Sequence, residues 1–376
     1  MKQWHILICI FLFSCNRQLP ETPSTEYLYV GTYSVRGSEG VYVYQFDRNT
    51  RSFQGIQQVE GPDSPSFLEI HPNGALLYTA NRAGIGTDTL SGSVCAYRIA
   101  PVSGQLQEIN QSSSYGFSPC HISVDDAGDW LYVSHYGGGS LSVFPVREDG
   151  GVGTLLDSIK YHGHGFNPER QEAPHIHSIQ SLPGTDLFLA TDLGMDRLYF
   201  YHCSEEGLKP ATPPYMETEP GTGPRHFVLS PGRNLIYISE ELSNTVSVYS
   251  LNGTESHFLQ RLSTLPADYT EPNTVADIHL SPDGHFLYVS NRGHNSLAIY
   301  RVDPESGLLH LVGHADSGGK VPRYFMIDPQ GTFVLVANQD SDNIVLFDRD
   351  QETGLLTATD IELKVPSPVC LKWLVR

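Results

Sequence analysis

The chain has 376 residues, and 42 acidic against 23 basic side chains give it a formal charge of −19 at pH 7. This acidity argues against nucleic acid as a partner, because phosphate backbones are bound by clustered lysine and arginine. It does not exclude a small anion, which needs only a few local arginines. With 39% hydrophobic residues, 35 glycines and 25 prolines, the chain can bury a large core and is richer in turns than a helical protein.

The first 15 residues, "MKQWHILICIFLFSC", predict export. One lysine precedes an apolar stretch of about eight residues, which fits a signal-peptide core and is too short to span a bilayer. "LFSC" at 12–15 resembles the bacterial lipoprotein processing box, although Phe13 fits it poorly; an ordinary cleaved signal peptide is the alternative. We expect lipidation of Cys15, a polar linker over 16–26, and a periplasmic or outer-membrane-anchored bacterial protein whose only membrane contact is this lipid anchor.

From residue 64 onward the sequence repeats itself. Six units begin with "SPSFLEIHPNGALLYTANR", "SPCHISVDDAGDWLYVSHY", "APHIHSIQSLPGTDLFLATDL", "GPRHFVLSPGRNLIYISEEL", "TVADIHLSPDGHFLYVSNR" and "KVPRYFMIDPQGTFVLVANQ", at Ser64, Ser118, Ala173, Gly223, Thr274 and Lys320. Each unit has a short apolar run, a turn, an alternating second strand, a third strand such as "NSLAIYRV" and a weaker fourth. Four strands in each unit of about 40–50 residues is typical of a β-propeller blade.

The two ends of the chain supply one more blade. "YLYVGTYS", "GVYVYQFD" and "SFQGIQQVE" near the N-terminus give only three strands, and "PSPVCLKWLV" at the C-terminus resembles the missing first strand. The sequence therefore predicts an all-β, seven-bladed propeller over residues 27–376. Its blades are four-stranded and antiparallel, and the terminal strands share one blade and close the ring.

Polar residues gather at strand ends that should meet around the channel of such a ring. First strands begin with His121, His175, His177, Arg225, His226, Asp277, His279, Arg323 and Tyr324, and second strands end with Asn81, Arg82, His135, Asp192, Glu240, Glu241, Asn291, Arg292, Asn338 and Gln339. For some of them a structural role is at least as well supported as a role in the site, because buried polar groups commonly satisfy backbone atoms or neighbouring blades. These residues are Asp192, Asn338, His226 and Asp277.

Strand alternation limits which neighbours can face the channel together. Successive side chains point to opposite faces of a strand. Only one of Arg225 and His226, and only one of Glu240 and Glu241, should therefore face the axis, whereas His175 and His177 share a face. The pattern does not choose within the first two pairs.

Several motifs together resemble the seven-bladed propeller lactonases, a family that includes 6-phosphogluconolactonases and fungal carboxymuconate-cyclising enzymes. They include "HPNGALLYTANR", "PHIHSI", "TDLGMDRLYFY", "GPRHFVLSP" and "ADIHLSPDGHFLYVSNRG", and the resemblance extends from about Tyr27 to the C-terminus. It implies a channel-mouth site in which His177, Arg225 and Glu241 are catalytic. Family arginines correspond to Arg292 and Arg323, which we expect to bind substrate together with His175 and His279.

This residue set suits the opening of a lactone ring. His177 or Glu241 could activate water, Arg225 could stabilise the oxyanion, and Arg292 or Arg323 could hold a phosphate or carboxylate. The sequence has no "GxSxG" motif, so direct water attack is favoured over an acyl-enzyme. We expect no cofactor and no metal, because clustered arginines repel a dication, and we expect Cys95, Cys120, Cys203 and Cys370 to be buried structural thiols.

The leading hypothesis is thus an exported hydrolase of carbohydrate metabolism that cleaves the carboxylic-ester bond of a sugar lactone. We expect its small-molecule partner to be an anionic lactone. The family's best-known substrate is 6-phosphogluconolactone, a cytoplasmic metabolite, which an exported protein would not meet. A muconolactone-type cycloisomerase or lyase, and a non-catalytic propeller that binds a ligand or partner, are the alternatives.

Overall fold

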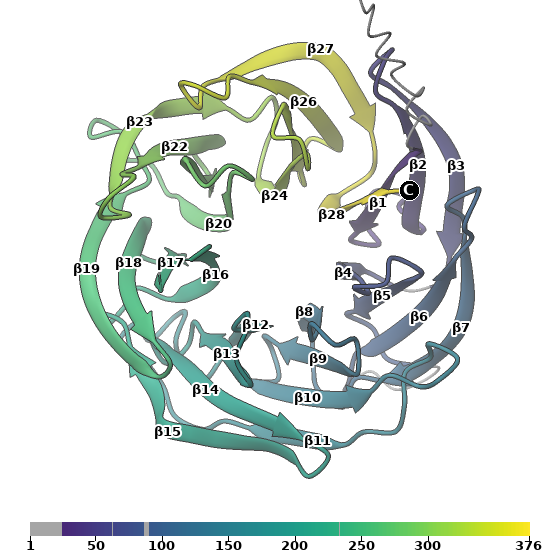
Figure 1. The fold of residues 1–376 in the computed structure, drawn as a ribbon, viewed down its shortest axis with the longest axis horizontal. Coiled ribbons are helices and arrows are strands. Elements are labelled where there is room, and N and C mark those ends of the chain that lie inside the picture. Colours follow the sequence, from purple (N-terminus) through teal and green to yellow (C-terminus); the bar gives the residue numbers. More distant parts are fainter. Residues whose placement is uncertain (1–24, 62, 86–89, 233) are drawn as a thin grey trace, which may run out of the picture.

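The computed structural model describes residues 25–61, 63–85, 90–232 and 234–376, and every regular element within them is a β-strand. Seven four-stranded antiparallel sheets surround a central channel (Figure 1). This arrangement confirms the predicted seven-bladed propeller. The predicted signal segment, Cys15 and linker residues 16–24 lie outside the described residues. Within the described part, no helix has the length and apolar character needed to cross a membrane.

The blades are numbered here from the N-terminus, with strands given from the channel outward. Blade 1 is β28 (Pro368–Val375), β1 (Glu26–Thr32), β2 (Gly40–Asp47) and β3 (Ser52–Glu60). Blade 2 is β4 (Pro65–Ile70), β5 (Leu76–Asn81), β6 (Ser93–Ile99) and β7 (Leu106–Ser113). Blade 3 is β8 (Pro119–Val124), β9 (Trp130–His135), β10 (Ser140–Pro145) and β11 (Asp157–Lys160). Blade 4 is β12 (Ile176–Ser181), β13 (Leu187–Asp192), β14 (Arg197–Ser204) and β15 (Gly207–Glu217).

The remaining three blades follow the same order. Blade 5 is β16 (Pro224–Ser230), β17 (Leu235–Glu240), β18 (Thr245–Asn252) and β19 (Glu255–Ser263). Blade 6 is β20 (Thr274–Leu280), β21 (Phe286–Arg292), β22 (Ser296–Val302) and β23 (Leu309–Asp316). Blade 7 is β24 (Pro322–Ile327), β25 (Phe333–Asn338), β26 (Asn343–Arg349) and β27 (Leu356–Lys364).

The ring closes through the two ends of the chain, as predicted. β28 pairs antiparallel with β1, with Leu28 opposite Trp373 and Tyr29 opposite Lys372. Trp373 Nε1 donates a hydrogen bond of 2.8 Å to Glu26 Oε2. In Figure 1 the yellow C-terminal strand lies against the purple N-terminal one. Because both end strands are paired within one sheet, blade 1 has four strands like the others.

A repeated tyrosine ties each of several blades to the next. The hydroxyl groups of Tyr29, Tyr78, Tyr237 and Tyr288, all on second strands, donate to the carbonyls of Gly104, Gly150, Gly307 and Gly354 at 2.8, 2.9, 2.8 and 2.7 Å, respectively. Each acceptor lies in the turn between the two outer strands of the following blade. The apolar faces between the blades are buried, and the tyrosines satisfy their own polar atoms within this core.

Each innermost strand from β4 to β24 carries a β-bulge near its start. The register with the second strand shifts between Pro65 and Phe67, Pro119 and His121, Ile176 and Ser178, Pro224 and His226, Val275 and Ile278, and Pro322 and Tyr324. A bulge inserts an unpaired residue and redirects its side chain. Among the residues in these bulges are Cys120, His177, Arg225 and Arg323, and all four side chains lie at one mouth of the channel.

The bulge corrects one expectation from strand alternation. Arg225 and His226 both point inward: Arg225 Nε lies 3.0 Å from Glu241 Oε2, and His226 Nδ1 lies 2.8 Å from Asp277 Oδ1. Alternation fails here because Arg225 occupies the bulge and has no direct partner on β17. Two residues that are adjacent in sequence can therefore make contacts at different depths of the channel.

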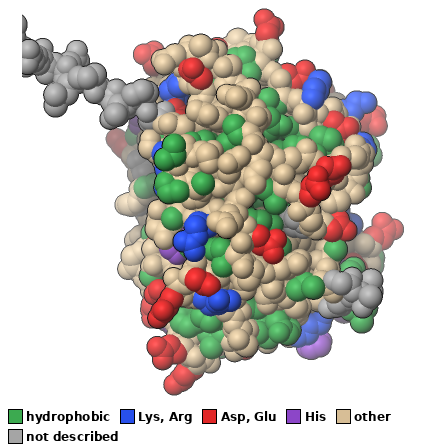
Figure 2. Space-filling model, turned by 90° about the vertical axis from the view of Figure 1, so that its right-hand side faces the viewer, with side chains coloured by type: hydrophobic (Ala, Val, Ile, Leu, Met, Phe, Trp, Pro, Cys, Tyr) green, Lys and Arg blue, Asp and Glu red, His purple; other side chains and the backbone are tan. Residues whose placement is uncertain are grey.

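The side of the ring shown in Figure 2 has no extended basic surface among its described residues. On the side shown in Figure 2, acidic side chains are spread singly among basic, polar and apolar ones, and the described residues there form no continuous basic patch. This distribution agrees with the net charge of −19.

Candidate active site

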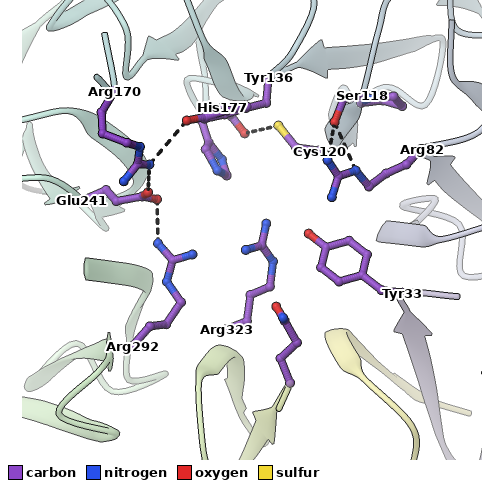
Figure 3. A pocket seen from close by; sticks show the side chains of 12 residues that line it. Tyr33, Arg82, Ser118, Cys120, Tyr136, Arg170, His177, Glu241, Arg292 and Arg323 are labelled. Atoms are coloured by element: carbon purple, nitrogen blue, oxygen red, sulfur yellow. Dashed lines mark hydrogen bonds and ion pairs between the residues drawn. The ribbon is translucent and has the colours of Figure 1, made fainter. Parts of the chain in front are cut away.

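A cavity of about 260 Å³ opens at the channel mouth where the bulged residues lie (Figure 3). Its lining side chains come from all seven blades and from two connections between blades: Tyr33, Arg82, Ser118, Pro119, Cys120, Tyr136, Arg170, His177, Glu241, Arg292, Arg323 and Gln339. Four arginines and one carboxylate line it, so the cavity has an excess of positive charge in an otherwise acidic protein.

Glu241 is the counter-ion of three arginines. Its carboxylate lies 2.6 Å from Arg170 Nη2, 2.7 Å from Arg292 Nη2 and 3.0 Å from Arg225 Nε, and the residue is 4% exposed. Burial alone would raise the pKa of Glu241, but Arg292, Arg225 and Arg170 outweigh it and lower that pKa to about 2. Glu241 is therefore ionised at neutral pH and is a poor proton acceptor there.

Arg225 lies beneath the cavity and does not line it. It is 2% exposed, and its Nε atom forms a close ion pair with Glu241 without the alignment of a hydrogen bond. Burial, with repulsion from Arg292 and Arg323, lowers the pKa of Arg225 to about 9, so the guanidinium still carries its charge at pH 7. Its position makes it a support for Glu241.

His177 points into the middle of the cavity, between the Glu241 cluster and Arg323 (Figure 3). It is 3% exposed, and its Nδ1 atom is buried without a hydrogen-bond partner. Burial and then repulsion from Arg225 hold the pKa of His177 well below its usual value. The imidazole is therefore neutral at physiological pH, and a neutral imidazole can accept a proton.

The other half of the cavity contains two arginines that lack a carboxylate partner among the described residues. Arg82 donates to Ser118 Oγ from Nε at 3.1 Å and from Nη2 at 2.8 Å. The guanidinium carbons of Arg82 and Arg323 lie 5.2 and 5.3 Å from the ring centre of Tyr33. Arg82 lies on the side of the cavity opposite Glu241, and Arg323 lies between Arg292 and Tyr33 (Figure 3). These two arginines form the part of the cavity best suited to an anion.

The structure brings four of the predicted site residues together and sets three apart. His177, Glu241, Arg292 and Arg323 line the cavity, and Arg225 supports it from below. His175 lies behind Tyr136, on which its ring stacks at 4.3 Å with an 8° tilt. His279 does not share this cavity: it lies further along β20, in a second cavity of about 420 Å³ lined also by His121, His226 and Asp277.

Glu240, the neighbour of Glu241, points away from the channel as strand alternation predicts. Arg261 Nε donates to its carboxylate at 2.8 Å, and Ser247 Oγ donates at 2.6 Å. Glu240 therefore holds blade 5 together and has no part in the cavity.

The cavity also contains residues that the sequence did not single out. Arg170 comes from the long connection between β11 and β12, which has no counterpart in the other repeat units. Tyr33 and Tyr136 follow second strands, as Arg82 does. The position after the second strand was a usable signal for Arg82, Tyr33 and Tyr136, but nothing in the repeat indicated Arg170.

The expectation that all four scattered cysteines are buried is wrong for two of them. Cys95 and Cys370 are buried, but Cys203 is half-buried and Cys120 is a half-buried residue of the cavity wall. Burial raises the pKa of Cys120 to about 11 despite the arginines nearby. Its sulfur therefore remains a thiol at neutral pH, which is a weak nucleophile. Within the described residues, no three His, Cys, Asp or Glu side chains are grouped so that they could hold a metal ion.

Comparison with known proteins agrees with the fold. Residues 27–373 match the family described as "Lactonase, 7-bladed beta-propeller". A 6-phosphogluconolactonase of Bacillus subtilis is 36% identical over 353 residues, which cover 93% of this chain and 99% of that protein. A 6-phosphogluconolactonase of Formosa agariphila is 35% identical over 80% of this chain and 86% of its own. The structure of a periplasmic gluconolactonase of Pseudomonas aeruginosa superposes with a TM-score of 0.88 at 35% identity, over 93% of this chain and 99% of that one. The chain belongs to the seven-bladed β-propeller lactonase family.

Proposed function

We propose that this protein hydrolyses an anionic sugar lactone by direct attack of a water molecule that His177 activates. The observation that carries the proposal is the division of labour in the cavity. Its one carboxylate, Glu241, is committed to three arginines, which leaves the neutral imidazole of His177 as the group able to take a proton. The names of the relatives from B. subtilis and P. aeruginosa support a lactone as substrate.

The reaction needs one base and one cationic acceptor for the oxyanion. As the water oxygen bonds to the lactone carbonyl carbon, one water proton passes to His177. Arg292, which faces the cavity, stabilises the oxyanion, while Arg225 keeps Glu241 in place from below. The bond from the carbonyl carbon to the ring oxygen then breaks, and His177 returns the proton to the leaving alkoxide. The product is a hydroxy acid, which ionises at neutral pH.

Direct water attack fits the nucleophiles present in the cavity better than an acyl-enzyme. Ser118 accepts both of its hydrogen bonds from Arg82, and no described histidine is paired with it. Cys120 is held as a thiol by burial. Neither side chain has the adjacent base that a covalent mechanism requires.

The positive charges of Arg82 and Arg323 favour an anionic substrate. Both line the cavity close to the ring of Tyr33, which offers a flat surface for the sugar ring. A phosphate or carboxylate there would neutralise two charges that have no carboxylate partner among the described residues. Export, as the N-terminal sequence predicts and as the periplasmic relative from P. aeruginosa supports, would restrict the substrate to lactones outside the cytoplasm.

A panel of lactones in a pH-stat tests the proposal, since each hydrolysis releases one proton. The panel contains 6-phosphogluconolactone, uncharged gluconolactone, a uronic-acid lactone and a carboxylated muconolactone. We expect hydrolysis of a charged lactone with a higher kcat/KM than of the uncharged one, and loss of activity in His177→Gln. Isomerisation of the muconolactone without hydrolysis would instead identify a cycloisomerase, and no reaction with any member would contradict an enzymatic role.

A substitution of Arg82 tests whether this arginine binds the anionic group of the substrate. Arg82→Gln should raise KM for the charged lactone by about tenfold or more, because a charged hydrogen bond contributes about 1.5–3 kcal/mol, and should leave the uncharged lactone unaffected. Arg98→Gln, which changes an exposed arginine on β6, is the matched control. Equal losses for charged and uncharged lactones would show that Arg82 does not bind the anion.

A further inference from the structure

Three buried imidazole nitrogens below the cavity lack hydrogen-bond partners. They are Nδ1 of His121, Nδ1 of His177 and Nε2 of His226, from the innermost strands of blades 3, 4 and 5. The ring of His226 lies 5.1 Å from that of His177 and 5.8 Å from that of His121. All three residues are less than a tenth exposed. Because a buried polar atom without a partner is costly, this cluster calls for an explanation.

The proton positions on His226 follow from its bond to Asp277. Asp277 is 2% exposed, and its carboxylate lies 2.8 Å from His226 Nδ1 and 2.8 Å from His279 Nε2. Burial opposes the charge, but His279 and His226 hold the pKa of Asp277 well below its usual value. An ionised carboxylate only accepts hydrogen bonds, so Nδ1 of His226 carries the proton and Nε2 is an acceptor.

The group that can supply a proton to this acceptor is His177. Burial lowers the pKa of His226 to about 4 and that of His177 well below its usual value, so both rings are neutral and each carries one proton. The charged and titratable groups around His226 are Arg225 on its own strand, Asp277 and His279 on β20, His177 on β12 and His121 on β8. Arg225 only donates, and its Nη1 is 3.4 Å from His226 Nδ1, which is already committed to Asp277.

No direct hydrogen bond joins His177 to His226, and their ring spacing leaves room for a bridging water. A buried water needs two to four polar partners, and the three unpartnered nitrogens supply them. The second cavity, of about 420 Å³, is lined by His121 and His226, so two of the three residues also border a space large enough for water.

We propose that His226, fixed by Asp277, is a positioning residue for His177: through one buried water it accepts the Nδ1 proton of His177. This keeps the other nitrogen of His177, on the cavity side, unprotonated and free to take a proton from the attacking water. The inference rests on the proposed lactone hydrolysis. It follows the logic by which an acceptor behind a catalytic histidine fixes its tautomer.

Asp277→Asn is the decisive variant. An asparagine amide can donate to His226 Nδ1, which would move the His226 proton to Nε2 and leave His177 Nδ1 without its acceptor. We expect kcat on the charged lactone to fall about 10- to 100-fold, the range of effects seen for residues that orient a functional histidine, with KM changed less than twofold. His226→Gln, whose side-chain carbonyl can still accept, should retain more activity than His226→Phe.

A control separates this effect from loss of a buried aspartate in general. Asp328 is fully buried in blade 7, where it accepts from Arg48 and from backbone N–H groups of its turn. Asp328→Asn should lower the midpoint of thermal unfolding but leave the kcat of the folded protein unchanged.

A second measurement needs no turnover. Long-range ¹H–¹⁵N correlation spectra of protein labelled at histidine, assigned with His177→Gln, should show His177 protonated at Nδ1 in the wild type and at Nε2 in Asp277→Asn. A wild-type His177 protonated at Nε2, or a folded Asp277→Asn with wild-type kcat, would overturn the inference and leave the proposed function intact. Hydrolysis of no lactone by the wild type would overturn the proposed function, while the tautomer spectra would still decide the hydrogen-bond arrangement.

Discussion

Glu241 illustrates how the neighbours of one side chain decide its chemistry. A glutamate at a channel mouth could act as a general base, but three guanidinium groups within 3.0 Å favour its ionised form too strongly. The imidazole of His177 has the opposite surroundings, because burial and nearby arginines disfavour its charged form. The arginines thus keep both groups unprotonated at neutral pH, but Glu241 is held by three of them, whereas His177 has no ion-pair partner among the described residues and has a lone pair free to accept a proton.

Glu241→Gln should destabilise the protein in a pH-dependent way. The wild-type carboxylate has a pKa of about 2 in the folded state against an ordinary value of 4.5, so its stabilising effect is present above pH 4.5 and is lost as the pH falls towards 2. At pH 7 we expect a loss of about 3–5 kcal/mol in the free energy of unfolding, because the buried Arg225 and the partly buried Arg170 and Arg292 lose their counter-ion.

Urea unfolding of both proteins from pH 7 down to pH 3 measures this difference, which should shrink below about pH 5. Glu217→Gln is the control, since Glu217 is an exposed partner of Arg197 and such surface pairs contribute at most about 1 kcal/mol. A difference between wild type and Glu241→Gln that stays constant over this pH range would show that ionisation of Glu241 is not what stabilises the site.

At the scale of the strand, the β-bulge explains both what the sequence predicted and what it did not. Repeat spacing, turn residues and alternation were sufficient for the blades, for ring closure and for the choice of Glu241 over Glu240 once the family resemblance was included. Alternation failed for Arg225 and His226 because it assumes one residue per register step, and a bulge is not visible in residue types alone. His279 was misplaced for the same reason. It follows the bulge in β20, and its side chain therefore lies deeper in the channel, in the second cavity.

Arg170 could not be predicted from the repeat because it lies in the connection between β11 and β12. Gln171 anchors that connection: it is fully buried, its Nε2 donates to Leu193 O and Asp196 Oδ1 at 2.8 Å each, and its Oε1 accepts from Asn167 N at 2.8 Å. The next residue along the chain towards the N-terminus, Arg170, is thereby held against Glu241.

Gln171→Ala should therefore act on the site through Arg170. Removal of the buried amide leaves its partners unsatisfied, at a cost of about 1–3 kcal/mol in the free energy of unfolding, and frees the connection that carries Arg170. We expect kcat/KM on the charged lactone to fall in Gln171→Ala and in Arg170→Ala, and the double variant to lose little more than either single one, because both act through one contact. Additive losses in this double-mutant cycle would show that Gln171 acts elsewhere.

At the scale of the whole molecule, the ring places a positive cavity in a negative protein. The chain carries a formal charge of −19, yet each blade adds only one to three side chains to the channel mouth, and the charged ones there are four arginines and one glutamate. Such a local excess of charge attracts an anion at short range, whatever the sign of the net charge. Because residues from all seven blades and two connections must meet, the site exists only while the ring is closed.

Closure depends on β28, and its removal should cost far more than the loss of an ordinary terminal segment. Terminal residues usually fray, but Val369, Cys370 and Leu371 of β28 are no more than 2% exposed and form the inner strand of blade 1. A chain that ends at residue 366 would leave β1 as an uncovered inner edge and break the contact between blades 7 and 1. We expect this truncation to lose cooperative thermal unfolding and lactonase activity together, whereas deletion of the exposed Arg376 alone should change neither.

Hydrogen exchange followed by mass spectrometry gives the matching result for the intact protein: amides of residues 369–371 should exchange as slowly as those of β24, because both open only when the ring opens. Fast exchange at residues 369–371, or a truncated protein that still melts cooperatively and retains activity, would show that the remaining six blades and β1–β3 hold the site without closure.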